Sequence, residues 1–198
     1  PTDLTTEQTD RAGTVVTFTS PTATDICDAN PSVTCTPTSG SSFPLGVTTV
    51  HCVGRDASGN VGESTFTVTV RDTTAPTITR PTDLLVEQAD RAGTVVNFSS
   101  PVLADLCDAS PTVTCTPASG STFPLGDTTV VCVARDSSGN ESQTTFKVTV
   151  RDTTAPTVTR PADLTIEQTN RAGTVATFPL PSAADVCDAN PSVTCLPA

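Results

Sequence analysis

Eight cysteines are the residues of this chain best suited to covalent chemistry, and they follow a fixed spacing. Three lie at positions 27, 35 and 52, three at 107, 115 and 132, and two at 187 and 195. No Cys-x-x-Cys pair occurs, and the chain has a single histidine. A zinc site is therefore disfavoured. Cysteines at fixed positions favour disulfides formed in an oxidising compartment.

Carboxylates and amides gather in turn-like segments. Asp105 and Asp108 lie in one segment, Asp136 and Asn140 in another, and Asp72 begins an Asp-Thr-Thr-Ala-Pro run. If these segments meet between two folded repeats, their oxygens are ligands of the kind Ca²⁺ prefers. The corresponding set for the next junction is Asp152, Asp185 and Asp188. Because Asp and Asn also form turns for backbone reasons alone, a role as solvated turn formers stays open.

Composition excludes several classes of function. With 10 Lys+Arg against 21 Asp+Glu, the net charge of −11 disfavours a nucleic-acid partner. The sequence contains no run of 18 apolar residues, so it predicts no membrane span. No Ser-His-Asp set, phosphate-binding loop or close carboxylate pair can be argued, so we expect no enzymatic activity. The chain has no initiating Met and no leader, which predicts a segment of a longer protein.

An 80-residue repeat organises the chain. Residues 1–80 align without a gap on residues 81–160, and 57 of the 80 positions are identical. A third copy begins at Pro161 and includes only its first half, residues 161–198. The sequence therefore predicts two complete domains, 1–80 and 81–160, and an incomplete third that continues beyond Ala198.

Within each repeat the pattern is that of β-strands. Apolar residues alternate with threonine over residues 65–70 and 145–150, which is typical of strands buried on one face. Gly, Pro, Asn and Asp cluster between such runs, where turns are expected. The predicted strands of the first repeat are 3–8, 13–19, 32–37, 41–43, 48–55 and 63–71.

Six or seven short strands in about 80 residues indicate an immunoglobulin-like sandwich. The Phe-Pro-Leu-Gly turn at 43–46 resembles a corner of fibronectin type III domains. The predicted fold class is all-β, with tandem immunoglobulin/fibronectin-III-like β-sandwich domains in an extended array. The predicted core of the first repeat is Leu4, Val16, Phe18, Val33, Phe43, Leu45, Val50, Phe66, Val68 and Val70. So thin a core benefits from covalent cross-links.

A family resemblance follows from the motifs of residues 33–60: Val-Thr-Cys-Thr-Pro, then Ser-x-Phe-Pro-x-Gly, then Cys52 and Asp-x-Ser-Gly-Asn. This run, repeated at 113–140, resembles the hyalin repeat (HYR) family. The Asp-Thr-Thr-Ala-Pro ending is similar to junctions of bacterial immunoglobulin-like adhesin repeats. The resemblance implies an extracellular adhesion or spacer module without enzymatic activity. One departure is that Arg80 and Arg160 stand where family members often carry a Cys that precedes the first strand.

The disulfide pairing follows from strand alternation in this fold. Cys35 shares a strand face with Val33, and Cys52 shares one with Val50, on strands that are neighbours in the sandwich. We therefore predict a Cys35–Cys52 bridge and, by analogy, a bridge between Cys115 and Cys132. Cys27–Cys35 is the rival pairing. The predicted pairing leaves Cys27 and Cys107 either as inert thiols or as cross-links to a neighbouring repeat or chain.

Other polar residues have simpler interpretations. His51 is expected on the outward face of its strand, and Asp10-Arg11 is expected to form a surface pair worth under about 1 kcal/mol. Asn97 and Asn140 begin glycosylation sequons, which matter only in a eukaryotic source.

The predicted function is structural. We expect an extracellular array (a stalk, fibre, appendage or matrix component) whose repeats join end to end, and whose chains pair laterally through Thr-rich edge strands. The expected partners are neighbouring repeats, like chains and a cell-surface or matrix ligand, and the only cofactor expected is Ca²⁺ at the junctions. One alternative is a module that binds a glycan or protein. A second is the spacer of a larger secreted enzyme.

Overall fold

The structure is a computed structural model that describes residues 1–196. Within this range the chain is all-β and forms no helix. The strands of the first repeat and its exit are β1 (Leu4–Glu7), β2 (Thr14–Val16), β3 (Ser32–Thr36), β4 (Ser41–Phe43), β5 (Gly46–Arg55), β6 (Val61–Arg71) and β7 (Thr77–Thr79). The remaining strands are β8 (Leu84–Glu87), β9 (Thr94–Val96), β10 (Val102–Ala104), β11 (Thr112–Thr116), β12 (Ser121–Phe123), β13 (Gly126–Arg135), β14 (Glu141–Arg151), β15 (Thr157–Thr159) and β16 (Ser182–Ala184).

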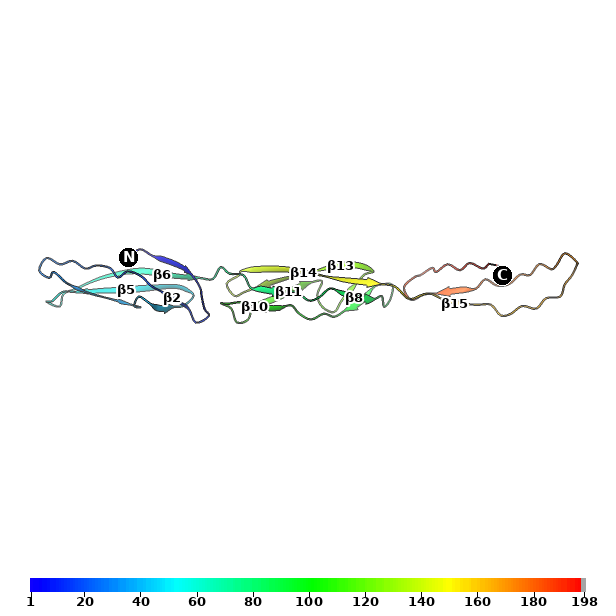
Figure 1. The fold of residues 1–198 in the computed structure, drawn as a ribbon, viewed down its shortest axis with the longest axis horizontal. Helices are drawn as coiled ribbons and strands as arrows, with labels where there is room; N and C mark the ends of the chain where they lie inside the picture. The colour runs from blue at the N-terminus through cyan, green and yellow to red at the C-terminus, as the bar shows by residue number, and fades with distance from the viewer. Residues whose placement is uncertain (197–198) are drawn as a thin grey trace. The chain divides into compact units, whose positions relative to one another are not determined.

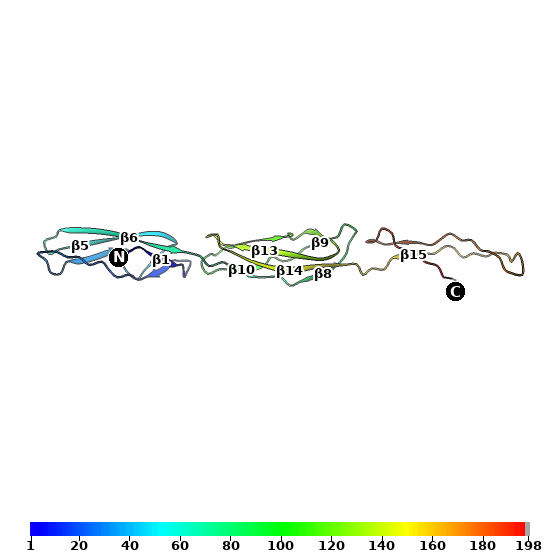
Figure 2. The same ribbon diagram turned by 90° about the horizontal axis from the view of Figure 1, so that it is seen from above.

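The main sheet of the first repeat has the strand order β1-β6-β5-β3. Its centre is the long antiparallel pair β5 and β6, which lie side by side in Figure 1. At one edge β1 runs parallel to β6, with Leu4 opposite Val68 and Glu7 opposite Arg71 (Figure 2). This parallel pairing carries the first strand up to the exit of the repeat, so Glu7 arrives beside the link that leaves it.

A second, two-stranded sheet pairs β2 with β4 and covers the first. Gly13, just before β2, has φ +121°, and a Cβ there would lie 2.6 Å from the carbonyl oxygen of Phe43. Only glycine fits this close approach. The sandwich therefore depends on Gly13 at the entry to β2 as well as on its apolar faces.

The core of the first repeat lies between these sheets. Its buried members are Val16, Cys35, Phe43, Val50, Cys52, Phe66, Val68 and Val70, with Leu4, Phe18 and Val33 packed against them. The inclusion of Leu45 in the predicted core is wrong, because its side chain is 50% exposed. Leu45 lies in the turn before β5, one residue out of phase with the inward-facing Val50 and Cys52.

The second repeat shows the same pattern, with strand orders β11-β13-β14-β8 and β12-β9. Its buried apolar residues are Val96, Phe123, Val130, Cys132, Ala134, Phe146, Val148 and Val150. In each repeat two phenylalanine rings meet edge to face with centroids 4.9 Å apart, Phe18 with Phe66 and Phe98 with Phe146.

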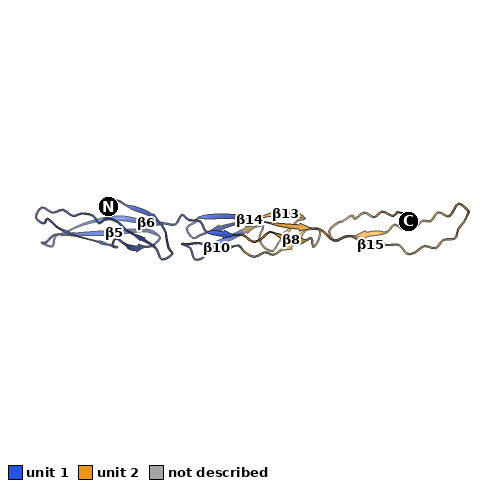
Figure 3. Cartoon of the chain, in the orientation of Figure 1, with its two compact units in different colours: residues 1–79, 101–114, 132–144 blue, residues 80–100, 115–131, 145–198 orange. Residues whose placement is uncertain are grey.

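The chain divides into two compact units whose boundary passes through the second repeat (Figure 3). The first unit contains Pro1–Thr79, Pro101–Thr114 and Cys132–Thr144. The second contains Arg80–Ser100, Cys115–Val131 and Thr145–Ala198. The link that leaves each complete repeat therefore lies in the same unit as the loops that receive it.

One pair of strands in each unit was not expected from the sequence. In the first unit β7 pairs antiparallel with β10, with Ile78 opposite Leu103. In the second unit β15 pairs with β16 in the same way, with Val158 opposite Ala183. These pairs tie each link to the repeat that follows it.

Candidate functional site at the repeat junction

The first junction is defined here as the link Asp72–Pro76, strand β7, and the loops 105–108 and 136–142 that contact them. The link leaves β6 directly, since the backbone amide of Gln8 donates to the carbonyl of Arg71 at 2.7 Å. The parallel pairing of β1 with β6 thus continues to the start of the link. All of these residues belong to the first unit.

Glu7 binds the first half of the link. Its carboxylate accepts hydrogen bonds from the Thr73 amide at 2.7 Å, the Thr73 hydroxyl at 2.9 Å and the Thr74 hydroxyl at 3.1 Å. These donors, the Thr73 amide above all, hold the pKa of Glu7 below its ordinary value because they stabilise the charged carboxylate. The end of the first strand therefore fixes the conformation of the link.

Asp72 and Asn140 connect the link to the next repeat. The buried Asp72 carboxylate accepts from the Ser138 hydroxyl at 2.9 Å. The Asn140 side-chain amide donates to the Asp72 carbonyl at 3.1 Å and to the Asp136 carboxylate at 2.8 Å. A glycan on Asn140 would replace one of its two side-chain amide hydrogens, which leaves one hydrogen for the Asp72 carbonyl and the Asp136 carboxylate. The sequon therefore lies where modification conflicts with the structure.

Pro76 anchors the second half of the link. It is among the fully buried side chains, and its carbonyl accepts a hydrogen bond from the Ser142 hydroxyl. Immediately afterwards β7 pairs with β10, and the Thr77 hydroxyl donates to the Ala104 carbonyl at 2.8 Å. The link is therefore an ordered part of the following repeat.

Arg11 and Cys107 make contacts across the junction that the sequence did not indicate. The Arg11 guanidinium donates to the carbonyls of Asp105 at 2.7 Å and Asp108 at 3.0 Å. The prediction that Arg11 pairs with Asp10 is therefore wrong. The Cys107 thiol donates to the Gln8 carbonyl at 3.4 Å. Burial, followed by nearby carboxylates, raises the pKa of Cys107, which lowers the fraction of reactive thiolate.

The predicted calcium ligands lie in two groups. Ligand atoms of Asp72 and Asp105 lie within 4.8 Å of one another and of the Cys107 sulfur. Asp108 accepts from the amides of Ser110 and Ser137, and both oxygens of Asp136 accept from Asn140. Calcium takes six to eight oxygens. Two converging carboxylates and a thiol fit that demand poorly unless Asp108 and Asp136 release their present donors.

The second unit contains the corresponding link, Asp152–Pro156. Glu87 accepts from the Thr153 amide at 2.7 Å, and the Arg91 guanidinium donates to the Asp188 carbonyl at 2.9 Å. Ligand atoms of Asp152, Asp185 and Cys187 again lie within 4.8 Å of one another. Asp185 caps the amides of Cys187 and Asp188, and these donors lower its pKa.

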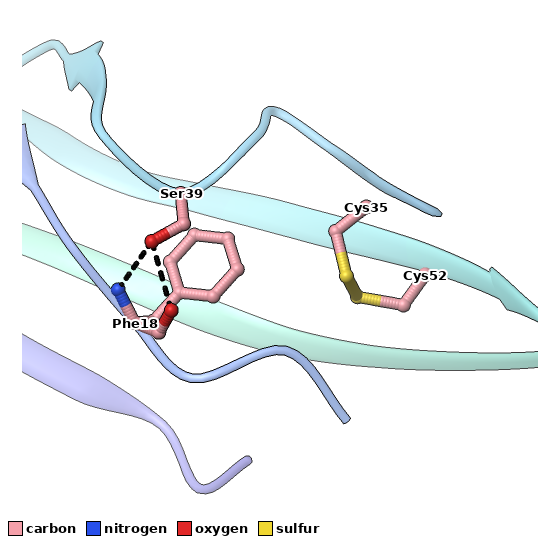
Figure 4. The surroundings of a disulfide bond; sticks show 4 residues. All are labelled: Phe18, Cys35, Ser39 and Cys52. Carbon is pink, nitrogen blue, oxygen red and sulfur yellow. Dashed lines mark hydrogen bonds between the residues drawn. A yellow bond between two sulfur atoms is a disulfide. The ribbon is translucent and has the colours of Figure 1, made fainter. Parts of the chain in front are cut away.

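Cys35 and Cys52 form a disulfide between the directly paired strands β3 and β5 (Figure 4). Beside it the Ser39 hydroxyl bridges the backbone amide and carbonyl of Phe18, which places that ring near the bond. Cys115 and Cys132 are also disulfide-bonded. Cys27 carries a free, exposed thiol, so the rival pairing of Cys27 with Cys35 is not formed.

The remaining predicted residues take ordinary surface positions. His51 is exposed and lies 3.3 Å from the Glu63 carboxylate. Asn97 is exposed as well. Sequence reasoning missed Glu7, Ser138 and Ser142 altogether. For Glu7, the available signal was its recurrence as Glu87 and Glu167 at the same position of each repeat, seven residues after Arg80 and Arg160 in the later repeats.

Fold and junction together define a class of protein: tandem, disulfide-bonded β-sandwich repeats whose links are ordered by the repeats on both sides. The sequence profile of the HYR domain matches residues 4–70 and 71–150, and the chain belongs to the HYR family. Membership supports an extracellular repeat module, and the disulfides are consistent with that location.

Three relatives illustrate the family. Hyalin of Strongylocentrotus purpuratus is 39% identical over 86% of this chain and 15% of that protein. Hyalin of Lytechinus variegatus is 35% identical over 88% of this chain and 34% of that protein. A serine-rich adhesin for platelets of Staphylococcus aureus is 33% identical over 56% of this chain. The chain thus spans between 15% and 34% of the length of the two hyalins that it matches.

Among solved structures, the similarity is low. Drosophila N-cadherin EC1-4 has a TM-score of 0.36 and 13% identity, and the match covers 76% of this chain and 48% of that one. Within residues 1–196 no helix is long and apolar enough to cross a membrane.

Proposed function

We propose that the chain is a stretch of an extracellular structural or adhesive array (a stalk, fibre, appendage or matrix component) in which each junction sets the geometry of successive repeats. The observation that carries this proposal is the first junction. Its link is bound by Glu7 on one side and by Asn140 and Ser142 on the other. A mere tether between independent domains needs none of these contacts.

The contacts give the junction a mechanical role. Bending there would expose the buried Pro76 and break the pairing of β7 with β10. Those losses oppose bending because buried polar groups would lose their partners. A series of such joints would transmit load along the chain, and the disulfides in each sandwich would resist unfolding under it.

Small-angle scattering of the whole chain tests this role. The double variant Asn140→Ala/Ser142→Gly removes the donors to Asp72 and Pro76 while leaving the core unchanged. We expect a broader distribution of maximum dimension and greater flexibility than in the parent chain. The matched control is Asn60→Ala in the first repeat, whose side-chain amide donates to Asp56 at 2.7 Å. If the double variant scatters like the parent, the junction does not set repeat geometry.

Ligand binding is a second candidate. The similarity to a serine-rich adhesin for platelets supports a surface-binding role. A module of this kind would use the loops 25–30 and 56–60, and lateral pairing with like chains would add multivalency. A glycan and cell-binding array with alanine at Asp28 and Asn30 tests it. Loss of a specific partner with unchanged scattering would favour binding over a purely structural role. A spacer role within a larger secreted enzyme would predict no partner in this array.

Calcium at the junctions is proposed as an additional stiffening element. The convergence of Asp72 with Asp105 supports it, and Asp152 with Asp185 offers the equivalent pair. Binding would require Asp108, Asp136 or Asp188 to turn toward the ion. Titration calorimetry with CaCl₂, with Asp105→Asn as the variant, gives a direct test. An absence of heat and of any chelator effect on scattering would remove calcium from the proposal.

A further inference from the structure

The end of the first repeat opposite its exit carries an open groove of about 400 Å³. Its lining includes Ala23, Val33, Gly54, Asn60 and Gly62, all within the first unit. In the 80-residue alignment Ala23, Asn60 and Gly62 correspond to Leu103, Asn140 and Ser142, which contact β7 or the link at the first junction. The groove of the first repeat is therefore equivalent to the surface of the second repeat that contacts the link and β7.

Equivalent residues show what the surface receives. In the second repeat, segment 102–104 forms β10 and pairs with β7, whereas segment 22–24 of the first repeat forms no strand. Asn140 is half-buried against the link, and its counterpart Asn60 is exposed. Asp136 is buried, and its counterpart Asp56 is half-buried. These differences in strand formation and burial are explained by the link and β7, which lie against the second repeat.

Small side chains make the groove deep. Ala23, Gly54 and Gly62 replace Leu103, Ala134 and Ser142 of the second repeat. A Cβ added at Gly62 would meet nothing within 4 Å, so space exists there for the serine found in the second repeat. The polar elements are kept, since Asn60 and Asp56 hold each other in the same arrangement as Asn140 and Asp136.

We propose that this groove binds the junction segment of another HYR repeat, with the sequence Asp-Thr-Thr-Ala-Pro-Thr followed by an apolar residue and Thr. The segment adds as an antiparallel strand to residues 22–24, places its proline in the groove and accepts a hydrogen bond from Asn60 at its Asp carbonyl. This inference rests on the proposed function, because it assumes that every pair of repeats joins through the same contacts as the first junction.

The probe is the synthetic decapeptide of residues 71–80, Arg-Asp-Thr-Thr-Ala-Pro-Thr-Ile-Thr-Arg, added to the whole chain. We expect amide chemical-shift changes at residues 22–24, Gly54 and Gly62, with a dissociation constant on the order of 1 mM for so short a strand. The same peptide with P76D should bind at least about tenfold more weakly, because its carboxylate would enter an apolar position. The equivalent residues of the second repeat should not shift, because β7 already occupies that surface.

A gain-of-function variant sharpens the test. Gly62→Ser restores the hydroxyl that Ser142 directs at the Pro76 carbonyl, so the peptide should bind about fivefold more tightly. Peptide binding that is absent, that ignores P76D, or that shifts other surfaces overturns the proposal. Concentration-dependent dimerisation without peptide would overturn it as well if it protects residues 22–24 but leaves residues 71–80 and 151–160 of both copies unprotected, because the occupant would then not be a junction segment. Any of these failures would leave the scattering test of the first junction unaffected.

Discussion

The two junctions share one half of their contacts and differ in the other. In both, a glutamate binds the threonines of the link, an arginine donates to carbonyls of the next repeat, and a cysteine thiol faces the carbonyl of Gln8 or Gln88. The turn with Ser138, Asn140 and Ser142 belongs to the first junction, and the equivalent positions of the third repeat lie beyond Ala198. Pro76 is fully buried there, whereas Pro156 in the second unit is exposed.

This difference separates two tasks within a junction. Hydrogen bonds from the preceding repeat order the link even where little of it is buried, as Glu87 does in the second unit. Burial requires the 136–142 turn, which covers the proline and takes the second carboxylate oxygen of Asp72. The preceding repeat therefore fixes the position of the link, and the following repeat buries it.

Substitution of the link proline should give the largest effect. Pro76→Asp buries a carboxylate without a partner and should destabilise the chain by about 3 kcal/mol. Pro156→Asp places the same charge on an exposed site and should cost less than about 0.5 kcal/mol. Denaturant unfolding of the two variants measures the contrast. Equal losses would show that burial of the link does not distinguish the junctions.

Removal of the junction arginines should give a smaller effect that both junctions share. Arg11→Ala removes two hydrogen bonds to backbone carbonyls and Arg91→Ala removes one, and each substitution should destabilise the chain by about 1 kcal/mol. Arg11→Lys should recover little of the lost stability, because the Arg11 guanidinium donates to two carbonyls at once and a lysine ammonium lacks that planar fork. Thermal unfolding with Arg55→Ala as the surface control provides the measurement. A clearly larger loss at only one junction would break the shared half of the comparison.

Thiol reactivity offers a test that needs no change in stability. Burial, helped by neighbouring carboxylates, raises the pKa of Cys107 and of Cys187, and both thiols face carbonyl oxygens. The exposed Cys27 lacks such a cover. Iodoacetamide at pH 8 should therefore label Cys27 roughly tenfold faster than Cys107. Peptide mapping by mass spectrometry gives the rates, and equal rates would mean that the junction does not shield its thiol.

The smallest expected effect is a pH dependence from the link-binding glutamates. Hydrogen bonds from the link lower the pKa of Glu7 and of Glu87 below their ordinary 4.5. For an acid with a lowered folded-state pKa, the stabilisation is complete above 4.5 and disappears as the pH falls through the lowered value. Unfolding midpoints between pH 3 and 7 should therefore decline below 4.5, and less steeply in Glu7→Gln. An unchanged slope in that variant would mean that its link contacts add no stability.

Much of the sandwich could be predicted from local pattern. Alternation of Thr and Val placed the strands within a few residues of their observed bounds, because a half-buried strand exposes every second side chain. The same alternation put Cys35 and Cys52 inward on neighbouring strands, where they are bonded. Leu45 was misplaced because a turn interrupts that alternation just before β5.

The junction could be predicted only in outline. The 80-residue period and the Asp-Thr-Thr-Ala-Pro run located it, and the acidic turns were expected to meet there. Which groups bind one another is a different matter. Asp108 and Asp136 are engaged by backbone and side-chain donors, while Arg11, about 94 residues away, reaches Asp105.

The sequence by itself thus determined the repeat, the strands and the faces on which the cysteines lie, because these follow from periodicities of two and eighty residues. Tertiary structure alone decided the partners of Glu7, Asp72 and Pro76. The partners of Asp72 and Pro76 come from a turn of the next repeat, and those of Glu7 lie 66 and 67 residues further along the chain. No local pattern encodes the distance between groups that the fold brings together.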